Sequence, residues 1–406
     1  MGQRLLNKEV DSRITIRPSK KITINDQTLP GLMFFGENND YPQLMEKLIL
    51  GSVTAIGSSS VYANFLTGHG FKNPDVNKAI IGKDSKGKDV TVMGLLAMGA
   101  GSISVNKGYY VQTNINARAE IKDCRLVPFK DSRFIKPDDT GYAAKIAVYD
   151  NWQKDKSKKY DKDKIVTYNV FNLQKDALLA QIKKAGGIKK YKGQIYFQFF
   201  DDRFFYPLST FDASYLDCDS EAQISLYENR TLRNGFFDKI IVSTSPGGTD
   251  DEQKVFVNKV TDMLGPDGDN ILVVETDVDE EGEIDTKRAI KIDVVETKVK
   301  PALFNTISES IANKIRITAG GIPKILIDYE GGKIFGLSGE SITVAANYFN
   351  AITAKERKLF GDSIGEILSN FKNPVLRNNT DWEIVPLNLI KQQKDGITNT
   401  NTATND

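Results

Sequence analysis

The sequence predicts an α+β fold, in which a mixed body of helices and strands is joined to a pair of helices. Apolar residues recur at helical spacing in residues 41–66, 219–235, 298–317 and 341–371. Between residues 109 and 200 the apolar residues alternate instead, which is typical of short antiparallel strands. A strand-helix-strand segment over residues 239–295 lies in the sequence between the helices predicted at 219–235 and 298–317. The ends of this insertion must therefore lie near each other.

The first forty residues are polar, with short alternating pieces, and predict an extended arm rather than a core element. Asp40 and Pro42 supply start signals for a helix. Its apolar face runs to Leu66, and Gly68 and Gly70 end it. Residues 95–100 predict a further helical segment.

The alternating segments predict strands at residues 109–115, 120–129, 144–149, 165–170 and 195–200. Residues 154–164 alternate lysine with aspartate, which indicates a solvated connection. Near the end, residues 382–387 predict one last strand. The Thr/Asn-rich residues 396–406 cannot build a core.

The helix over residues 219–235 has Asp219 or Ser220 as its cap, and Gly235 fits the left-handed residue that ends it. The insertion then predicts a strand at 239–243, a helix at 251–263 and strands at 270–276 and 289–295. A second helix follows at 298–317. It breaks at a glycine-rich turn, and a second glycine-rich segment, residues 330–339, precedes the long last helix. Two helices joined by such a loop, without a catalytic residue type, indicate a mechanical element.

Composition excludes several function classes. The 406 residues fit two or three domains, and 54 basic against 53 acidic residues give no global basic character. This balance argues against a conventional DNA-binding face, but not against a channel through which DNA slides.

Cys124 and Cys218 make no disulfide framework, and the single histidine, His69, is expected in a surface turn. No apolar run reaches the ~20 residues of a membrane span, and Met1 does not begin a signal peptide. We therefore expect a soluble protein made in the cytoplasm.

Three motifs resemble catalytic or metal sites. Residues 82–89 nearly spell a phosphate-binding loop, but Asp89 stands where the magnesium-binding hydroxyl belongs, which favours a charged surface turn. Residues 277–285 resemble the start of a calcium loop, yet Arg288 replaces the bidentate glutamate, which favours an acidic turn and leaves an incidental cation site open. Asp201, Asp202 and Arg203 are the nearest candidate for a nuclease site, and a strand-end turn is the favoured interpretation.

The order of these parts resembles phage portal proteins, particularly those of tailed phages with short portals. Five places carry the resemblance: residues 36–42 (GENNDYP); 109–112 (YYVQ) through 126–129 (LVPF); Tyr206-Pro207 before 219–236; the strand-helix-strand insertion; and 311–315 (IANKI) leading to Gly321-Ile322-Pro323. Their order and spacing make the match specific.

The resemblance implies a portal fold with a mixed α/β wing, paired stem helices, a small α/β clip, a channel loop and a long helix. The implied parts are an arm (1–40), wing (41–215), first stem helix (216–237), clip (238–297), second stem helix (298–318), channel loop with long wing helix (319–372), terminal wing strand (373–390) and flexible tail (391–406). Too little chain follows Leu387 for a helical crown.

The same resemblance implies a function and its partners. The chain would form a ring, usually a dodecamer, at one capsid vertex of the virion. Double-stranded DNA would pass through it without sequence-specific contact. The major capsid protein, the terminase large subunit and a head-tail adaptor would be its partners. The implied DNA-channel loop comprises Glu330, Gly331, Gly332, Lys333, Gly336 and Gly339, and the implied docking residues of the clip are Pro246, Asp250, Asp251, Asp267, Asp279 and Glu281.

The resemblance implies no catalytic residue, cofactor, metal or membrane. Another virion ring component, an adaptor or baseplate protein, is the alternative from a different class, although it needs neither paired stem helices nor a channel loop. A metal-dependent nuclease or an NTPase is the third class. The failed phosphate-loop motif and the lone His69 argue against it.

Overall fold

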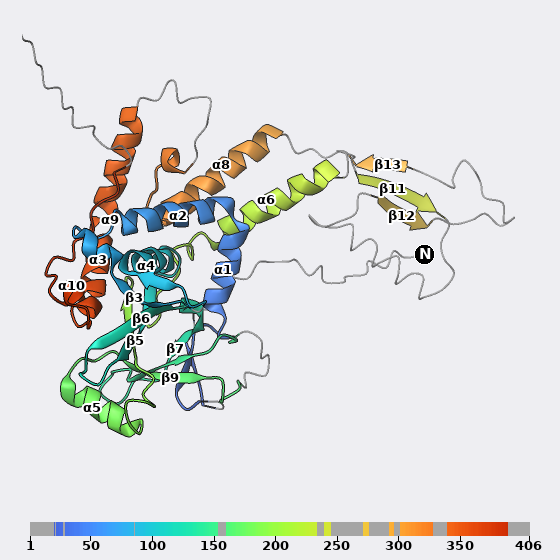
Figure 1. Ribbon diagram of the computed structural model, residues 1–406. Coiled ribbons are helices and arrows are strands. Elements are labelled where there is room, and N and C mark those ends of the chain that lie inside the picture. The colour runs from blue at the N-terminus through green and yellow to red at the C-terminus, as the bar shows by residue number, and fades with distance from the viewer. Residues whose placement is uncertain are drawn as a thin grey trace, which may run out of the picture. The chain divides into compact units, whose positions relative to one another are not determined.

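The computed structural model describes residues 20, 22–26, 29–84, 86–152, 160–233, 239–244, 271–275, 292–295, 301–327 and 339–388 (Figure 1). The chain divides into two compact units. The small unit comprises Met1–Arg17, Lys47–Ile56 and Ala213–Ile315, and the large unit comprises Pro18–Glu46, Gly57–Asp212 and Arg316–Asp406. Helices and strands occur together in both units, which confirms the predicted α+β class.

The large unit is built on a six-stranded sheet with the order β6-β5-β10-β9-β8-β7. Only β9 and β10 pair in parallel, and the other neighbours are antiparallel. The strands are β5 (Gly108–Ile115), β6 (Ile121–Val127), β7 (Ser132–Phe134), β8 (Lys145–Val148), β9 (Val166–Val170) and β10 (Gln194–Phe199). Both Tyr109 and Tyr110 are fully buried. Because successive side chains of a strand point to opposite faces, both faces of this sheet are covered.

One face packs against helices α4 (Val92–Asn106) and α9 (Gly339–Leu368). The Tyr109 ring meets Phe360 of α9 edge-on at 5.5 Å, and the Tyr196 hydroxyl donates to Glu366. Gly99 of α4 lies beneath Phe360, and a Cβ at Gly99 would be only 2.9 Å from that ring. The two helices are therefore in direct contact over the sheet.

The opposite face carries an aromatic cluster. Phe134 meets Phe197 edge-on at 4.9 Å, and its neighbours Phe199, Phe205 and Tyr206 are also in ring contact with it. Strands β1 (Thr23–Asn25) and β2 (Leu32–Phe34) form a hairpin, and Leu32 and Phe34 are buried with Trp152 and Tyr160. The arm prediction is therefore wrong for this stretch, because its apolar residues complete the core.

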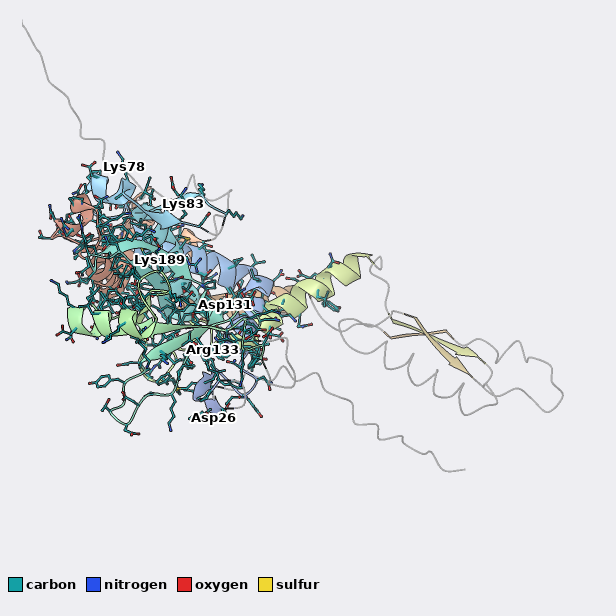
Figure 2. The ribbon with its side chains drawn as sticks, turned by 60° about the horizontal axis from the view of Figure 1, so that its bottom comes forward. Asp26, Lys78, Lys83, Asp131, Arg133 and Lys189 are labelled. Carbon is teal, nitrogen blue, oxygen red and sulfur yellow. The ribbon has the colours of Figure 1, made fainter. Side chains whose placement is uncertain are left out.

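A buried arginine joins this hairpin region to the first helix. Arg133 is fully buried and donates to the backbone oxygens of Asn39, Lys130 and Ser132 and to the side chain of Asn39 (Figure 2). Neutral carbonyl oxygens, rather than a carboxylate, therefore take up its hydrogen bonds. Burial lowers the pKa of Arg133 from its ordinary value.

The first predicted helix is two helices, α1 (Tyr41–Gly51) and α2 (Val53–Thr67), with an angle of 106° between them. The break is at Ser52, whose hydroxyl accepts a hydrogen bond from Ala55 N and so caps α2. The predicted stop is confirmed, because α2 ends at Thr67 and Gly68 has a φ of 51°.

Other predicted bounds shift. Helix α4 is longer than residues 95–100, and α6 (Tyr215–Arg233) begins before Asp219, so neither Asp219 nor Ser220 is its cap. Helix α8 spans Pro301–Thr318, and α9 begins at Gly339 rather than at Ser341. Residues 382–387 form no strand, and Ile384 makes only an isolated bridge with Phe71.

Several elements of the structure were not predicted from the sequence. They are α3 (Pro74–Lys78), β3 (Ile80–Lys83), β4 (Asp89–Thr91), β7, α5 (Lys175–Lys184) and α10 (Pro374–Arg377).

Candidate functional site

The residues predicted to line the DNA channel and to form the docking surface of the clip lie almost entirely outside the described part of the chain. Of the channel-loop residues, only Gly339 is described, as the first residue of α9. Glu330, Gly331, Gly332, Lys333 and Gly336 lie outside it. All six clip residues, Pro246, Asp250, Asp251, Asp267, Asp279 and Glu281, lie outside it as well, as do the predicted helix at 251–263 and the acidic turn at 277–285. The elements that carry these segments are described.

The strands of the insertion form one sheet in the small unit. Strand β11 (Lys239–Thr244) lies between β12 (Ile271–Glu275), which is parallel to it, and β13 (Ile292–Val295), which is antiparallel. These strands confirm the ones predicted from residue 239 to residue 295. In the chain they fall between α6 and α8, so one sheet is bracketed by two helices of the same unit.

A carboxylate of α6 fixes the start of α2 within the small unit. Glu221 accepts hydrogen bonds from the hydroxyls of Ser52 and Thr54, the latter at 2.6 Å, and from Thr54 N at 3.2 Å. A negative charge at a helix N-terminus is stabilised by the unpaired N–H groups there. A Cβ at Gly51 would lie 3.6 Å from the Ala222 side chain, so the two helices are in van der Waals contact.

An ion pair connects the two helices that bracket the insertion. Lys314 of α8 donates to Asp217 of α6 at 3.1 Å. The lysine side chain is 60% exposed, so this pair contributes little to the stability of the protein.

The small unit exposes several large apolar side chains. At the α1–α2 corner, Leu50 is 68% exposed and Val53 is 74% exposed. Leu216, Leu226 and Tyr227 of α6 and Ile307 of α8 are exposed as well. Leu50 and Val53 lie on either side of the Ser52 break, so this corner exposes two large apolar side chains next to each other in the chain.

Helix α9 in the large unit has two different faces. Phe349, Phe360 and Ile364 are fully buried. Val344, Tyr348, Ile352 and Leu359 are exposed; we call these four residues the α9 stripe. Their spacing places them on one side of the helix. From Ser341 to Ala354 the helix carries no charged residue, so Val344, Tyr348 and Ile352 have no charged neighbour in this part of the helix.

The loop predicted to line a channel starts from an ordered turn. Gly320 and Gly321 have φ values of 88° and 70°, and the N–H groups of Gly321 and Ile322 donate to the carbonyl of Arg316. The turn Lys324–Leu326 follows, and a Cβ at Gly57 of α2 would lie 3.3 Å from the Ile327 side chain. The residues on both sides of the loop, Ile327 and Gly339, thus belong to ordered structure.

A polar cluster that the sequence did not indicate joins α2, α4 and α9. Lys107, in the left-handed position that ends α4, donates to the Tyr62 hydroxyl at 2.6 Å and to Glu356 at 3.0 Å. The Tyr62 hydroxyl donates to the same carboxylate. Burial raises the pKa of Glu356 to about 7 and lowers the pKa of Lys107 to about 8, and their ion pair opposes both shifts.

The motifs that resemble catalytic sites are surface features where the structure describes them. Residues 82–84 and 86–89 lie at the ends of β3 and β4 and in the connection between them, where Asp84 accepts from the backbone N–H groups of Lys86 and Lys88. His69 is exposed in the turn after α2. Asp201 pairs with Arg203 at 2.8 Å after β10. Within the described ranges, no three His, Cys, Asp or Glu side chains are arranged to hold a metal.

Length and composition identify no single helix of the described chain that could cross a membrane, although α1 and α2 pass that test together as a bent pair.

Comparison with known proteins gives structural likenesses only. No protein-family model matches the chain, and no curated protein matches it. It is similar to a chain in the neck of a native GTA (gene transfer agent) particle computed with C12 symmetry, with 12% identity, 89% of each chain covered and a TM-score of 0.45. It is similar to one in the neck of an empty GTA particle computed with C6 symmetry, with 12% identity, 82% of each chain covered and a TM-score of 0.44. An HK97-family phage portal protein from Corynebacterium diphtheriae matches with 8% identity, over 74% of this chain and 82% of that one, with a TM-score of 0.35. The structural likeness of this chain is thus to particle necks and to a phage portal protein.

Proposed function

We propose that this chain is the subunit of a portal ring at one vertex of a phage capsid, through which DNA is packaged and ejected. The observation that carries the proposal is the pair of helices α6 and α8, which brackets the β12-β11-β13 sheet within one compact unit. Together with the turn before residues 328–338 and the 30-residue helix α9, this matches the order of parts that the sequence resemblance implies. The role is structural and includes no catalytic step.

The exposed apolar residues support assembly into a ring. A ring that closes by rotation joins two different faces of each subunit, one to the neighbour on each side. The chain exposes apolar side chains on both units, at the α1–α2 corner and along the α9 stripe. A net charge of +1 does not oppose association. We infer that neighbouring subunits cover these surfaces.

Residues 328–340 are the proposed channel loop, in which Lys333 is the only basic residue. In a ring this charge would recur once per subunit at one level of the channel. Each lysine–phosphate contact is weak and depends on salt, which suits sliding or retention of DNA. The ordered turn at Gly320 and the start of α9 would hold the loop at its two ends.

The insertion between α6 and α8 is the proposed clip. It would dock the terminase large subunit during packaging and the head-tail adaptor afterwards. The large unit would supply the wing, which meets the major capsid protein.

Electron microscopy of the purified protein tests the proposal directly. We expect a ring, most simply a dodecamer, with a central hole wide enough for duplex DNA. A compact monomer at all protein concentrations and salts would contradict the proposal.

Deletion of residues 239–295, with α6 and α8 joined by a short glycine linker, tests the proposed clip. We expect a folded large unit that no longer binds the terminase large subunit. Unchanged terminase binding would show that the boundaries or the docking role of the proposed clip are wrong.

Substitution of the loop lysine tests the channel. Lys333→Glu should leave the ring intact but reduce the DNA content of filled capsids. Lys324→Glu, in the turn before the loop, is the matched control, because it changes the net charge equally. Normal DNA content in Lys333→Glu particles would contradict the role of the loop.

A further inference from the structure

A strongly basic segment stands out from the neutral chain. Residues 175–192 contain six lysines and one acidic residue, Asp176, and so carry a net charge of +5. The whole chain carries +1, so the remaining residues carry −4. The segment comprises α5, which connects β9 to β10, and the loop that leads back into the sheet (Figure 1). The lysines are Lys175, Lys183, Lys184, Lys189, Lys190 and Lys192, which we call the α5 patch.

Buried polar side chains hold this loop in place. Gln194 is fully buried and donates to the Gln181 side chain and to the Asn172 carbonyl, both at 2.9 Å. The Tyr191 hydroxyl donates to the same Gln181 oxygen at 2.6 Å. Because the Gln194 side chain is buried and must be hydrogen-bonded, this network ties α5 and the following loop to β10.

The last turn of the loop is pressed against β5. Gly193 has a φ of 89°, and a Cβ there would lie 2.2 Å from the Thr113 carbonyl oxygen. The buried Gln112 side chain donates to the Lys192 carbonyl at 3.1 Å. The lysines are therefore presented by a defined backbone.

The charges of the α5 patch are exposed and unneutralised. All six lysines are exposed, and none joins an ion pair with another described residue. On the neighbouring strand β6, Arg125 donates to Gln112 and adds a further positive charge. Asp123 on β6 accepts a hydrogen bond from the neutral Asn114 side chain and brings one formal negative charge that offsets Arg125. The six lysines against the single Asp176 still leave the segment itself strongly positive.

We propose that the α5 patch binds the phosphate backbone of duplex DNA without sequence preference. Helix α5 has ten residues and is about 15 Å long, a length over which duplex DNA presents several phosphates. Lysines act as flexible point charges suited to phosphates, whereas base recognition uses planar side chains placed in a groove. Within the segment only one large apolar side chain, Leu179, is exposed, so an acidic protein partner would find little apolar anchorage.

This site is separate from the proposed channel loop and does not require the ring. If the ring forms, each subunit contributes one patch, and weak contacts to one DNA molecule add through their high effective concentration.

Fluorescence anisotropy of full-length protein with a short random-sequence duplex tests the proposal, between about 50 and 200 mM salt. The patch variant is Lys183→Gln, Lys184→Gln, Lys189→Gln and Lys190→Gln. Lys78→Gln, Lys83→Gln, Lys86→Gln and Lys88→Gln form the matched control, because they remove equal charge from exposed positions on α3 and the β3–β4 hairpin. Lys189 of the patch and Lys78 and Lys83 of the control are labelled in Figure 2.

We expect at least tenfold weaker binding for the patch variant than for the control variant. The slope of log K against log salt should become shallower by about 3 to 4, at about 0.9 for each phosphate that a lysine no longer neutralises. Equally weakened binding in the two variants would overturn the proposal. Binding of poly-glutamate but not of DNA would overturn it in favour of an acidic protein partner.

Electron microscopy of the same samples separates this result from the proposed function. Rings with undiminished DNA binding in the patch variant would reject the patch and leave the portal proposal intact. Patch-dependent binding by a protein that forms no ring would do the reverse.

Discussion

The described parts of the large and small units differ in where their apolar residues are buried and where they are exposed. In the large unit the central sheet is buried on both faces, by α4 and α9 on one side and by the aromatic cluster around Phe134 on the other. In the small unit, Leu50 and Val53 at the helix corner are mostly exposed. The large unit therefore has a two-sided core of its own and exposes the α9 stripe outside that core, whereas in the small unit the exposed apolar residues lie at the corner between two helices.

Helix α9 shows the same contrast within two adjacent residues. Phe349 is fully buried and meets Phe65 edge-on at 5.0 Å, whereas Tyr348 is 57% exposed. Substitutions on the two faces should therefore separate folding from assembly.

Phe349→Ala should have the largest effect on folding. Removal of this ring leaves a cavity beside Phe65 and Tyr62 and should lower the free energy of unfolding by about 3–5 kcal/mol. Urea unfolding followed by tryptophan fluorescence measures the loss. Phe349→Leu, which keeps much of the volume, should cost clearly less. A loss no larger than that of an exposed substitution would remove the distinction between the two faces of α9.

Lys107→Met should have a smaller, pH-dependent effect. It leaves the Glu356 carboxylate without its cation in a site where the two side chains are 21% and 31% exposed, and should cost about 2 kcal/mol near pH 8. Burial raises the pKa of Glu356 above its unfolded value. A carboxyl group whose pKa is higher in the folded than in the unfolded protein stabilises the fold only while it is protonated. Its contribution to the free energy of unfolding is therefore fully present below the unfolded pKa and is lost as pH rises through the folded pKa of about 7. The cost of Lys107→Met should therefore be small near pH 5, where Glu356 is protonated, and should grow as pH rises through about 7 and Glu356 ionises. It should stop growing near pH 8, where Lys107 begins to lose its own charge.

Unfolding experiments at several pH values check this dependence. The double variant with Glu356→Gln should lose the additional pH dependence, because the titrating carboxyl is gone. A cost of Lys107→Met that stayed constant from about pH 5 to 8 would contradict the role assigned to the cluster.

The sequence predicted elements whose cause is local and missed those whose cause is distant. Gly68 ends α2 as predicted, because a left-handed glycine acts within its own turn. The break at Ser52 was missed, because it depends on Glu221, 169 residues further along the chain. Helix α5 was missed because only Leu178 among its residues is buried, so its apolar periodicity is weak. The proposed channel and clip residues stay predictions, since they lie outside the described chain.

The polar cluster at Lys107 could not be predicted for a similar reason. Its three members come from α2, α4 and α9, and each alone has the sequence context of an ordinary surface residue. The α9 stripe, in contrast, can be recognised in the sequence, because Val344, Tyr348 and Ile352 follow one another at intervals of four residues. The sequence cannot tell which side of that helix is covered, because apolar residues occur on both.

Glu221→Ala tests the corner in the small unit and should cost about 1 kcal/mol, the usual loss for a helix cap. The carboxylate holds Ser52 and Thr54 at the start of α2, so its removal leaves those groups to water. Glu228→Ala, on the same helix and exposed, is the matched control and should change the free energy of unfolding very little. Equal effects of the two substitutions would show that the cap does not stabilise the corner.

The smallest effect on folding should come from Tyr348→Ser combined with Val344→Ser. Both side chains are mostly exposed, so the free energy of unfolding should change by less than about 0.5 kcal/mol. The ring should nevertheless weaken, because a neighbour that covers the α9 stripe would no longer bury these apolar side chains, and sedimentation should show a shift toward smaller species. Asn347→Ser, at an exposed polar position next to Tyr348, is the control and should leave assembly unchanged. If the double variant unfolded as Phe349→Ala does, the stripe would belong to the core of the large unit. If it stayed folded and assembled normally, the neighbour would have to bind elsewhere, with the α1–α2 corner as the next surface to test.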